Sequence, residues 1–187
     1  KPNGGKGSAL NAGARIAQGE ILMFVDADGV FTSDTIPAML RAFDDPQVGA
    51  VCGNDRPINL DRVLTRFLAL VSHVGTGMVR RALHLLNCVP VVSGNIGAFR
   101  ADALLSVSSE IGPLRPDTIG EDLELTWRLR LAGWRVAFQP DAIVYAESPS
   151  TLTGLWKQRV RWARGLLQGL RIHQNAVGSG QYGLFGY

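Results

Sequence analysis

A short apolar run that ends in acidic residues constrains the fold more than any other segment. Residues Ile21 to Val25 are all apolar and lead directly into Asp26-Ala27-Asp28-Gly29. Such a short, wholly apolar run is typical of a strand buried on both faces. A helix capped by Ser33 or Asp34 and a second apolar run, Val48 to Gly53, are expected next. Strand, helix and strand in this order predict an α/β fold, with a mainly parallel sheet flanked by helices.

Hydrophobic periodicity predicts the helices of the first half. One helix is expected from Ala9 to Gln18, with Gly19 as a left-handed cap. The helix after Asp34 should bury a face at helical spacing, formed by Ile36, Met39, Leu40 and Phe43. The stretch from Asp61 to about Asn87 should bury Leu64, Phe67 and Val71. It predicts two helices, because Gly75 and Gly77 weaken its middle.

The second half contains one ambiguous segment. A third strand is expected at Val89 to Val92, before the turn Ser93-Gly94-Asn95. In residues 121–132 the leucines and Trp127 alternate strictly, which favours a strand, but the composition and the terminator Gly133 favour a helix. We predict a helix there and strands near residues 136 and 143–145. A last helix, capped by Ser150, should run from 151 to 173, with a loop at 178–186.

Composition and charge limit the classes of function. The chain of 187 residues is 46% hydrophobic and 19% charged, which excludes a mostly disordered protein. The net charge is only +3, but no Asp or Glu follows Glu147, whereas five Lys and Arg residues do. This asymmetry indicates a local anionic partner, such as phosphates or an anionic membrane surface. Positive charge confined to one helix argues against nucleic-acid binding.

Three further features concern membrane spans, the start of the chain and the cysteines. No run of about 18 uncharged apolar residues occurs, so no segment of this sequence is expected to span a bilayer. The chain begins at Lys1 within a Gly-rich stretch, and we expect a fragment with an upstream portion missing. Cys52 and Cys88 lack metal-ligand spacing and are expected to be buried in a reducing compartment.

Asp26 and Asp28 are candidates for nucleotide and metal binding. They follow the first predicted strand, and ligands of open α/β sheets bind at the carboxyl ends of strands. Asp28 suits Mg²⁺ or Mn²⁺, which are held by one or two carboxylates together with substrate phosphates. The alternative is that both residues only stabilise a turn.

Three other motifs could bear chemistry. Glu121 and Asp122 open a predicted helix, where acidic residues favour the helix dipole, or where Asp122 could act as a general base. Gln158, Arg161 and Trp162 share one helix face and could bind a diphosphate and a sugar, or simply belong to an amphipathic helix. The run Asn3-Gly4-Gly5-Lys6-Gly7 could hold phosphate through backbone N–H groups and Lys6, although it lacks the Walker spacing.

Together, in this order, the motifs resemble those of family 2 glycosyltransferases. They are Lys6-Gly7-Ser8-Ala9-Leu10-Asn11, Asp26-Ala27-Asp28, Ser93-Gly94-Asn95 leading into Gly97-Ala98-Phe99-Arg100, Gly120-Glu121-Asp122 and Gln158-Arg159-Val160-Arg161-Trp162. The resemblance extends from Asn3 to about Gly169 and is strongest to processive membrane synthases of poly-N-acetylglucosamine, chitin, hyaluronan and cellulose. The Gln-x-x-Arg-Trp element is its most specific part.

This resemblance implies a GT-A fold and an inverting transfer of N-acetylglucosamine or glucose from a UDP-sugar to the hydroxyl of a growing polysaccharide. It implies that Asp122 is the catalytic base and that Asp28 binds Mg²⁺ or Mn²⁺. The implied substrate-binding residues are Lys6, Asp26, Glu121, Gln158, Arg161 and Trp162. Two departures stand out: Gly120 replaces a frequent Thr, and the first nucleotide-binding strands are absent from this chain.

The resemblance also implies a place in the cell. Residues 1–150 would be the catalytic GT-A core, and 151–187 an interface helix and loop. The protein would lie in the cell inner membrane with its catalytic domain on the cytoplasmic face. The membrane would be contacted through transmembrane helices outside this chain and through the 151–173 helix.

Other functions remain open at this point. A non-processive family 2 enzyme would act on a lipid or a single acceptor. A nucleotidyltransferase also uses paired Asp residues and a metal, but it has no need of the Gln158 to Trp162 element and would release pyrophosphate. A non-catalytic nucleotide-sugar-binding membrane domain would tolerate loss of Asp122.

Overall fold

Five strands form a single sheet with helices on both faces. The structure is a computed structural model that describes residues 4–186. The strands are β1 (Ile21–Val25), β2 (Val30–Phe31), β3 (Val48–Pro57), β4 (Ile96–Arg100) and β5 (Arg135–Ala146). The α-helices are α1 (Gly5–Ile16), α2 (Thr35–Arg41), α3 (Val63–Ser72), α4 (Arg80–Leu85), α5 (Ala101–Val107), α6 (Glu121–Leu131) and α7 (Leu152–Ile172). Shorter segments are the 3₁₀ turns η1 (Ala42–Asp44) and η3 (Gly180–Gly186) and the π-helical η2 (His73–Val79).

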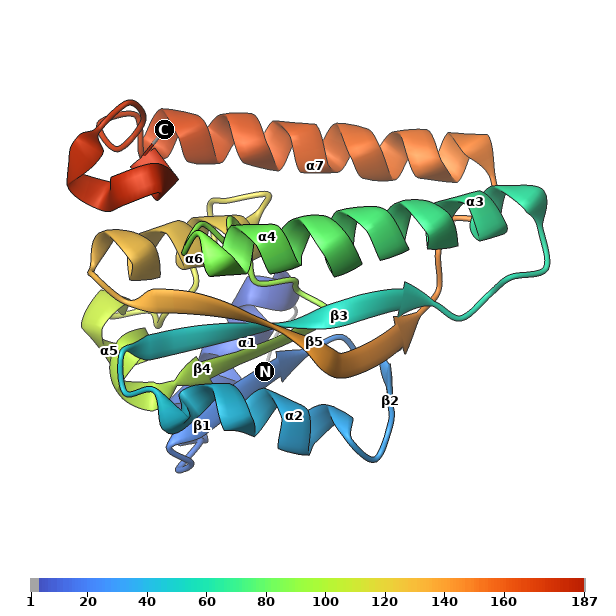
Figure 1. Cartoon of the computed structure of the whole chain (residues 1–187). Coiled ribbons are helices and arrows are strands. Elements are labelled where there is room, and N and C mark those ends of the chain that lie inside the picture. The colour runs from blue at the N-terminus through green and yellow to red at the C-terminus, as the bar shows by residue number, and fades with distance from the viewer. Residues whose placement is uncertain (1–3, 187) are drawn as a thin grey trace.

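The helices form layers around the sheet. Figure 1 shows α2 below the sheet and α3, α4 and α6 above it, with α7 lying over this upper layer. The predicted α/β class is confirmed.

The strand pairing corrects the expectation of a mainly parallel sheet. The order is β1-β4-β3-β5-β2, and in the described part of the chain only the β3–β5 pair is parallel. The physical reason is that β4 lies between β1 and β3 and runs opposite to both. The strand-helix-strand segment therefore does give two strands of the same direction, but they are not neighbours.

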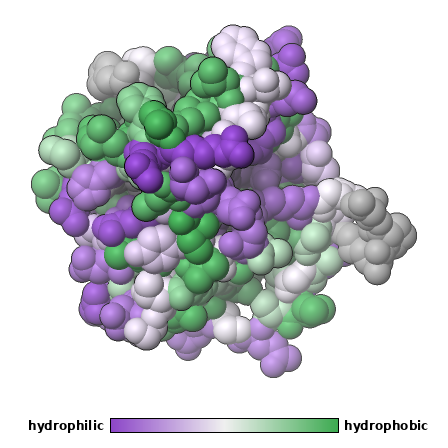
Figure 2. Space-filling view, turned by 90° about the vertical axis from the view of Figure 1, so that its right-hand side faces the viewer, coloured by the Kyte–Doolittle hydropathy of each residue, from purple (hydrophilic) through white to green (hydrophobic). Residues whose placement is uncertain are grey.

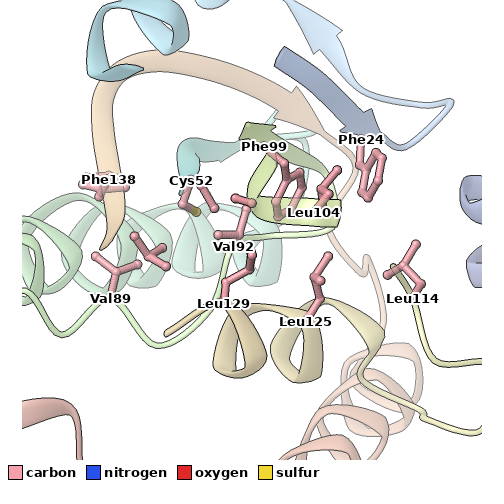
Figure 3. Packing of buried hydrophobic residues seen from close by; sticks show 13 residues of the cluster. Phe24, Cys52, Val89, Val92, Phe99, Leu104, Leu114, Leu125, Leu129 and Phe138 are labelled. Atoms are coloured by element: carbon pink, nitrogen blue, oxygen red, sulfur yellow. The ribbon is translucent and has the colours of Figure 1, made fainter. Parts of the chain in front are cut away.

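Two hydrophobic cores lie on opposite faces of the sheet, because side chains alternate along each strand. The upper core contains Phe24, Cys52 and Phe99, and the lower core contains Val51, Ile96 and Val144. In Figure 3, Leu125 and Leu129 of α6 point toward Val92 and the sheet. The strand predicted at 21–25 and the buried Cys52 are thus confirmed, and the strands predicted near 136 and 143–145 are parts of one strand, β5.

The strand predicted at Val89 to Val92 is wrong. This segment is largely buried but pairs with no strand of the described chain, and β4 begins only at Ile96. Side chains of α6 bind its backbone instead: the Trp127 ring N–H donates to the Pro90 carbonyl, and the Val92 N–H donates to Thr126 Oγ1 at 2.9 Å. The apolar run is therefore a core loop. Cys88 beside it is only half-buried, contrary to expectation.

The first helix is displaced from its predicted limits, whereas the second begins at Thr35 after Asp34, as predicted. The first begins at Gly5 and ends at Ile16, where Ala17 turns into extended backbone, so Gly19 is not a left-handed cap. In α2 the side chains of Ile36 and Leu40 are exposed, whereas Met39 is buried as predicted. The reason is that buried Thr35 donates its hydroxyl to the Ile143 carbonyl, which rotates the helix about its axis.

The two helices predicted between Asp61 and about Asn87 are present as α3 and α4, and the segment between them contains Gly75 and Gly77. A π-helical segment, η2, joins α3 to α4. The predicted buried face of α3 is wrong, because Phe67 and Val71 are exposed and Leu64 is only half-buried. Thr65 and Leu68 are buried instead. The Ser72 hydroxyl donates to the Asp55 carbonyl at 2.7 Å and so turns this face toward β3.

The helices predicted at 121–132 and 151–173 are confirmed as α6 and α7. Gly133 has the positive φ expected of a terminator, at 93°. The cap of α7 is Thr151 rather than Ser150, because the Thr151 hydroxyl accepts from the Gly154 N–H at 3.1 Å. No helix within residues 4–186 is long and apolar enough to cross a membrane.

Small residues let α7 dock closely against the start of α6. A Cβ placed on Gly165 would lie 3.2 Å from the backbone of Gly120, so the two segments touch through their main chains. The Gln168 side chain adds two hydrogen bonds, accepting from the Ile119 N–H and donating to the Asp117 carbonyl. Gly120, the departure from the family pattern, is therefore part of this contact.

A buried charge cluster completes the docking. Glu124, whose side chain is 1% exposed, binds Arg128 and lies 3.3 Å from His173 Nε2 at the end of α7. Burial alone would raise the pKa of Glu124, but His173 and Arg128 together hold this pKa below its usual value. The ionised carboxylate is thus the form that the fold stabilises.

We expect Leu129→Ala to destabilise the fold by about 2–5 kcal/mol, because it leaves a cavity in the upper core. Leu129 is fully buried (0% exposed), whereas Leu105 is 75% exposed. Leu105→Ala is the control and should change the free energy of unfolding by less than about 0.5 kcal/mol. Urea unfolding measures both, and equal effects would contradict the assignment of the core.

Glu124→Gln should cost about 3–5 kcal/mol at neutral pH, because Arg128 stays largely buried without its counter-charge. The folded-state pKa is depressed, so the stabilisation is complete above the unfolded pKa of about 4.3 and is lost as pH falls through the folded value. Denaturant titrations from neutral to acidic pH should therefore show the difference from wild type shrinking below about pH 4. If the difference in the free energy of unfolding between wild type and Glu124→Gln did not depend on pH, a stabilising role of the ionised Glu124 carboxylate would be contradicted.

Candidate functional site

The acidic exit of β1 meets the turn that precedes β4. Because Val25 pairs with Ile96, the end of one strand lies beside the start of the other. The Asp26 N–H donates to the Asn95 carbonyl at 3.4 Å. The turn is closed by the Ile96 N–H, which donates to the Ser93 carbonyl at 3.2 Å. The motif Ser93-Gly94-Asn95 is thereby held against Asp26.

Lys6 joins this pair from the first turn of α1. Its ammonium group forms an ion pair with Asp26 and donates to the Gly94 carbonyl at 3.3 Å. Gly5 to Gly7 lie in the helix rather than in a loop, and Asn3 is outside the described residues. A cation therefore lies at the end of β1, where an anionic phosphate would need one.

Asp122 approaches the same turn from the start of α6. A Cβ placed on Gly94 would lie 2.8 Å from Lys6 Nζ and 3.5 Å from Asp122 Oδ2. A side chain at this position would therefore displace Lys6. The other carboxylate oxygen, Asp122 Oδ1, accepts from the Leu123 N–H at 2.8 Å, which fixes the orientation of the side chain. The structure thus brings Lys6, Asp26 and Asp122 around Gly94.

Asp28 and Glu121 are close in sequence to two residues of this cluster, Asp26 and Asp122. Asp28 is exposed, and Glu121 is half-buried. No group of three or more His, Cys, Asp or Glu residues within residues 4–186 could enclose a metal. These carboxylates are therefore too few to enclose a metal by themselves. They do fit Mg²⁺ or Mn²⁺ held by one or two carboxylates and by substrate phosphates.

Gln158, Arg161 and Trp162 lie on α7, apart from the cluster around Gly94. Gln158 is half-buried, and Arg161 and Trp162 are exposed. Helical spacing puts them on the stripe that also carries Gly165, which touches Gly120 beside the start of α6. The Arg159 guanidinium stacks 4.3 Å from the Trp162 ring centre. The element therefore lies about one to two helical turns from the contact with α6.

Sequence reasoning missed Asp55, a partly buried carboxylate of β3. Its Oδ2 lies 3.6 Å from Arg80 Nη1, and burial raises its pKa, although Arg80 and the side chains of Ser93 and Asn95 oppose this. The negative charge of Asp26 raises the pKa of Asp55 further, in the same direction as burial. The signal in the sequence is an acidic residue that follows an otherwise apolar run.

Two cavities of the described structure lie away from this cluster. One, of about 510 Å³, lies between α4 and the first half of β5 and is lined by residues that include Arg41, His84 and Arg135. Another, of about 490 Å³, lies between the end of α6 and η3. The candidate site is therefore defined by converging side chains rather than by either of these cavities.

The chain matches a protein family over most of its length. The model of "Glycosyltransferase like family 2" matches residues 1–165. The poly-beta-1,6-N-acetyl-D-glucosamine synthase of Staphylococcus aureus strain COL is 36% identical over 164 residues, which are 87% of this chain and 39% of the synthase. The synthase of Staphylococcus epidermidis is 35% identical over the same length. The chain thus spans about two fifths of the length of these relatives.

Solved structures show the same fold. Mannosyltransferase PcManGT from Pyrobaculum calidifontis, in complex with GDP-Man and Mn²⁺, has a TM-score of 0.69 at 24% identity, and the match covers 91% of this chain and 44% of the mannosyltransferase. Glucosyl-3-phosphoglycerate synthase from Mycobacterium tuberculosis, with Mn²⁺, UDP and glucosyl-3-phosphoglycerate, has a TM-score of 0.54 at 19% identity over 94% of this chain and 58% of the synthase. The expected GT-A fold is confirmed, and with the family match it follows that the chain belongs to glycosyltransferase family 2.

Proposed function

We propose that this chain transfers a sugar, with inversion, from a UDP-sugar to the hydroxyl of a growing polysaccharide. The observation that carries the proposal is the convergence of Lys6, Asp26 and Asp122 on Gly94. The name of the Staphylococcus relatives supports N-acetylglucosamine or a similar hexose as the transferred sugar. UDP in one structural neighbour supports the choice of nucleotide.

The donor is bound at the end of β1. Asp26 accepts hydrogen bonds from the nucleotide, and Lys6, which is paired with Asp26, neutralises negative charge on the diphosphate. Asp28 would hold Mg²⁺ or Mn²⁺ together with the phosphates, in keeping with two structural neighbours that are complexes with Mn²⁺. The bound cation would stabilise charge that develops on the leaving diphosphate.

Asp122 deprotonates the acceptor. Its Oδ1 is held by the Leu123 N–H, and Oδ2 lies on the side of Gly94, where an acceptor hydroxyl would be placed. The proton passes to Asp122, the acceptor oxygen bonds to the anomeric carbon, and the bond to the diphosphate oxygen breaks. UDP leaves with the bonding electrons. Because the acceptor attacks the opposite face of the anomeric carbon, an α-linked donor gives a β-linked product. Glu121 lies beside this base and contributes to acceptor binding.

The stripe of α7 supplies the remaining contacts. Arg161 provides a planar fork for diphosphate oxygens, and Trp162 provides a flat apolar surface for a sugar ring. Gln158 provides an amide for the acceptor end. The contact of Gly165 with Gly120 supports a role of α7 in substrate binding, because it fixes α7 next to the start of α6.

A non-processive enzyme that acts on a lipid or a single acceptor is the second candidate. The observation in its favour is the likeness of the fold to glucosyl-3-phosphoglycerate synthase, whose bound glucosyl-3-phosphoglycerate is a small molecule. The length of the product decides between the candidates, because only a processive enzyme extends one chain many times before releasing it.

We also propose that residues 151–187 form a unit at the membrane surface, next to a catalytic core in 1–150. Several apolar side chains of α7 are exposed, among them Leu152 (75%), Trp156 (71%) and Leu167 (66%). Figure 2 shows hydrophobic side chains gathered on the upper part of one face, at the height of α7 in Figure 1. Together with the arginines of this helix, these side chains suit an anionic bilayer surface, in keeping with the cytoplasmic face of an inner membrane.

In the full-length protein in membranes, Asp122→Asn should abolish the release of UDP from the preferred UDP-sugar in the presence of Mn²⁺, because the base is lost. Asp102→Asn is the matched control, since Asp102 also lies in the first turn of a helix but is exposed on α5. It should retain wild-type rates. EDTA should stop release by wild type, and release by Asp122→Asn at the wild-type rate would refute the proposed base.

The membrane contact predicts that Leu152→Glu/Trp156→Glu reduces association of the chain with vesicles of anionic phospholipid by at least about tenfold, because two apolar anchors become charged. Vesicle sedimentation measures this association. The control is Ile16→Glu/Leu105→Glu, which alters two exposed apolar residues on other helices. Equal losses in both double variants would rule out a specific role of α7.

A further inference from the structure

A buried polar network lies directly under the Ser93–Asn95 turn. It begins at Asp55 on β3, whose backbone pairs with Val144 of β5 and accepts from the Ser72 hydroxyl. The Asp55 side chain is one fifth exposed, but its Oδ1 is buried and has no hydrogen-bond partner among the described residues. A buried acceptor without a partner calls for a physical reason.

Arg80 extends the network from the helical layer. It is the first residue of α4, directly after the π-helical η2, and π-helical segments often occur at functional sites. Its Nη1 lies 3.6 Å from Asp55 Oδ2 and donates to Cys52 Sγ at 3.0 Å. One guanidinium therefore connects the carboxylate to the sulfur on the same strand.

The network reaches the turn from two sides. The Ser93 N–H donates to Cys52 Sγ at 3.4 Å, next to the bond from Arg80. Burial raises the pKa of Asp55, and the side chains of Ser93 and Asn95 lie close enough to oppose this effect. The sulfur that Arg80 binds is therefore also bound by the first residue of the turn.

The turn is the part that connects the proposed donor and base residues. The Gly94 carbonyl accepts from Lys6, the Asn95 carbonyl accepts from the Asp26 N–H, and Gly94 borders Asp122. We propose that Asp55 and Arg80 are positioning residues that hold the Ser93–Asn95 turn in register between the donor site and the base. This inference rests on the function proposed above and assigns these two residues no contact with substrate.

Stability alone does not account for the pair. Burial raises the pKa of Asp55, so its ionised form is disfavoured in the folded state, and its contribution to stability decreases as pH rises through the folded pKa. Buried ion pairs can often be replaced by neutral residues without loss of stability. The contacts that link the pair to the turn, through Arg80 and Cys52 Sγ, are the observation that favours a positioning role.

The test uses the full-length protein and the variants Asp55→Asn, Arg80→Gln and the double variant. Arg81→Gln is the matched control, because Arg81 is the exposed neighbour of Arg80 on the same helix. For each variant, kcat and KM for the UDP-sugar are measured with the melting temperature. Asp122→Asn and wild type are assayed alongside.

In the double variant the melting temperature should return to near the wild-type value, because no charge is left buried without its partner. The kcat should nevertheless stay about 10- to 100-fold low, since a small displacement of the site is enough for such a loss. The KM for the donor should change less than kcat, by under about threefold, because Lys6 and Asp26 also bind each other directly. Arg81→Gln should match wild type.

Recovery of kcat together with the melting temperature in the double variant would overturn the proposal and leave the pair a purely structural role. The proposal would also be overturned if kcat were unchanged in these variants and only the KM for the UDP-sugar were raised. Failure of the proposed function has a different signature: wild type would release no UDP, or Asp122→Asn would be as active as wild type, whatever the behaviour of the Asp55 variants.

Discussion

The antiparallel pairing of β1 with β4 is the constraint on which the rest of the site depends. It places the acidic exit of β1 beside the turn before β4, although Asp26 and Asn95 are far apart in the sequence. Lys6 from α1 and Asp122 from α6 then reach the same point, because Gly94 has no side chain to exclude them. The arrangement of these three side chains thus depends on one strand pairing and one glycine.

Helix α6 connects the site to the core. Its inner face, with Leu125 and Leu129, belongs to the upper core, and its first turn carries Asp122. The same helix is buttressed by α7, through Gly165 against Gly120 and through His173 beside Glu124. Packing, a buried ion pair and the proposed base are therefore combined in about three turns of helix, so the position of Asp122 is set by the core rather than by a loop.

Much of this arrangement could be predicted from the sequence where local chemistry decides it. The strand at 21–25 is predictable to the residue, because a short apolar run with an acidic exit has few alternatives. Helix α6 is predictable despite the strict alternation of its leucines, since composition and Gly133 outweigh the periodicity. The GT-A fold follows from the order of the motifs rather than from any one of them.

Features that depend on tertiary contacts could not be predicted in this way. The sheet order requires knowing that β4 inserts between β1 and β3, which no local pattern encodes. The run at 89–92 resembles a strand, but its backbone is bound by Trp127 and Thr126 from α6. The surroundings of Asp55 appear only once Arg80 and the turn lie beside it. The roles of Asp28, the Gln158–Trp162 element and the base stay predictions.

The stereochemistry of the product tests the central claim most directly, because a single displacement assisted by Asp122 must invert the anomeric carbon. The full-length protein in membranes would be supplied with an α-linked UDP-sugar and Mn²⁺, and the new glycosidic bond would be assigned by NMR. The account predicts a β-linkage. An α-linkage would contradict it, since retention of the anomeric configuration requires a different mechanism from the proposed single displacement.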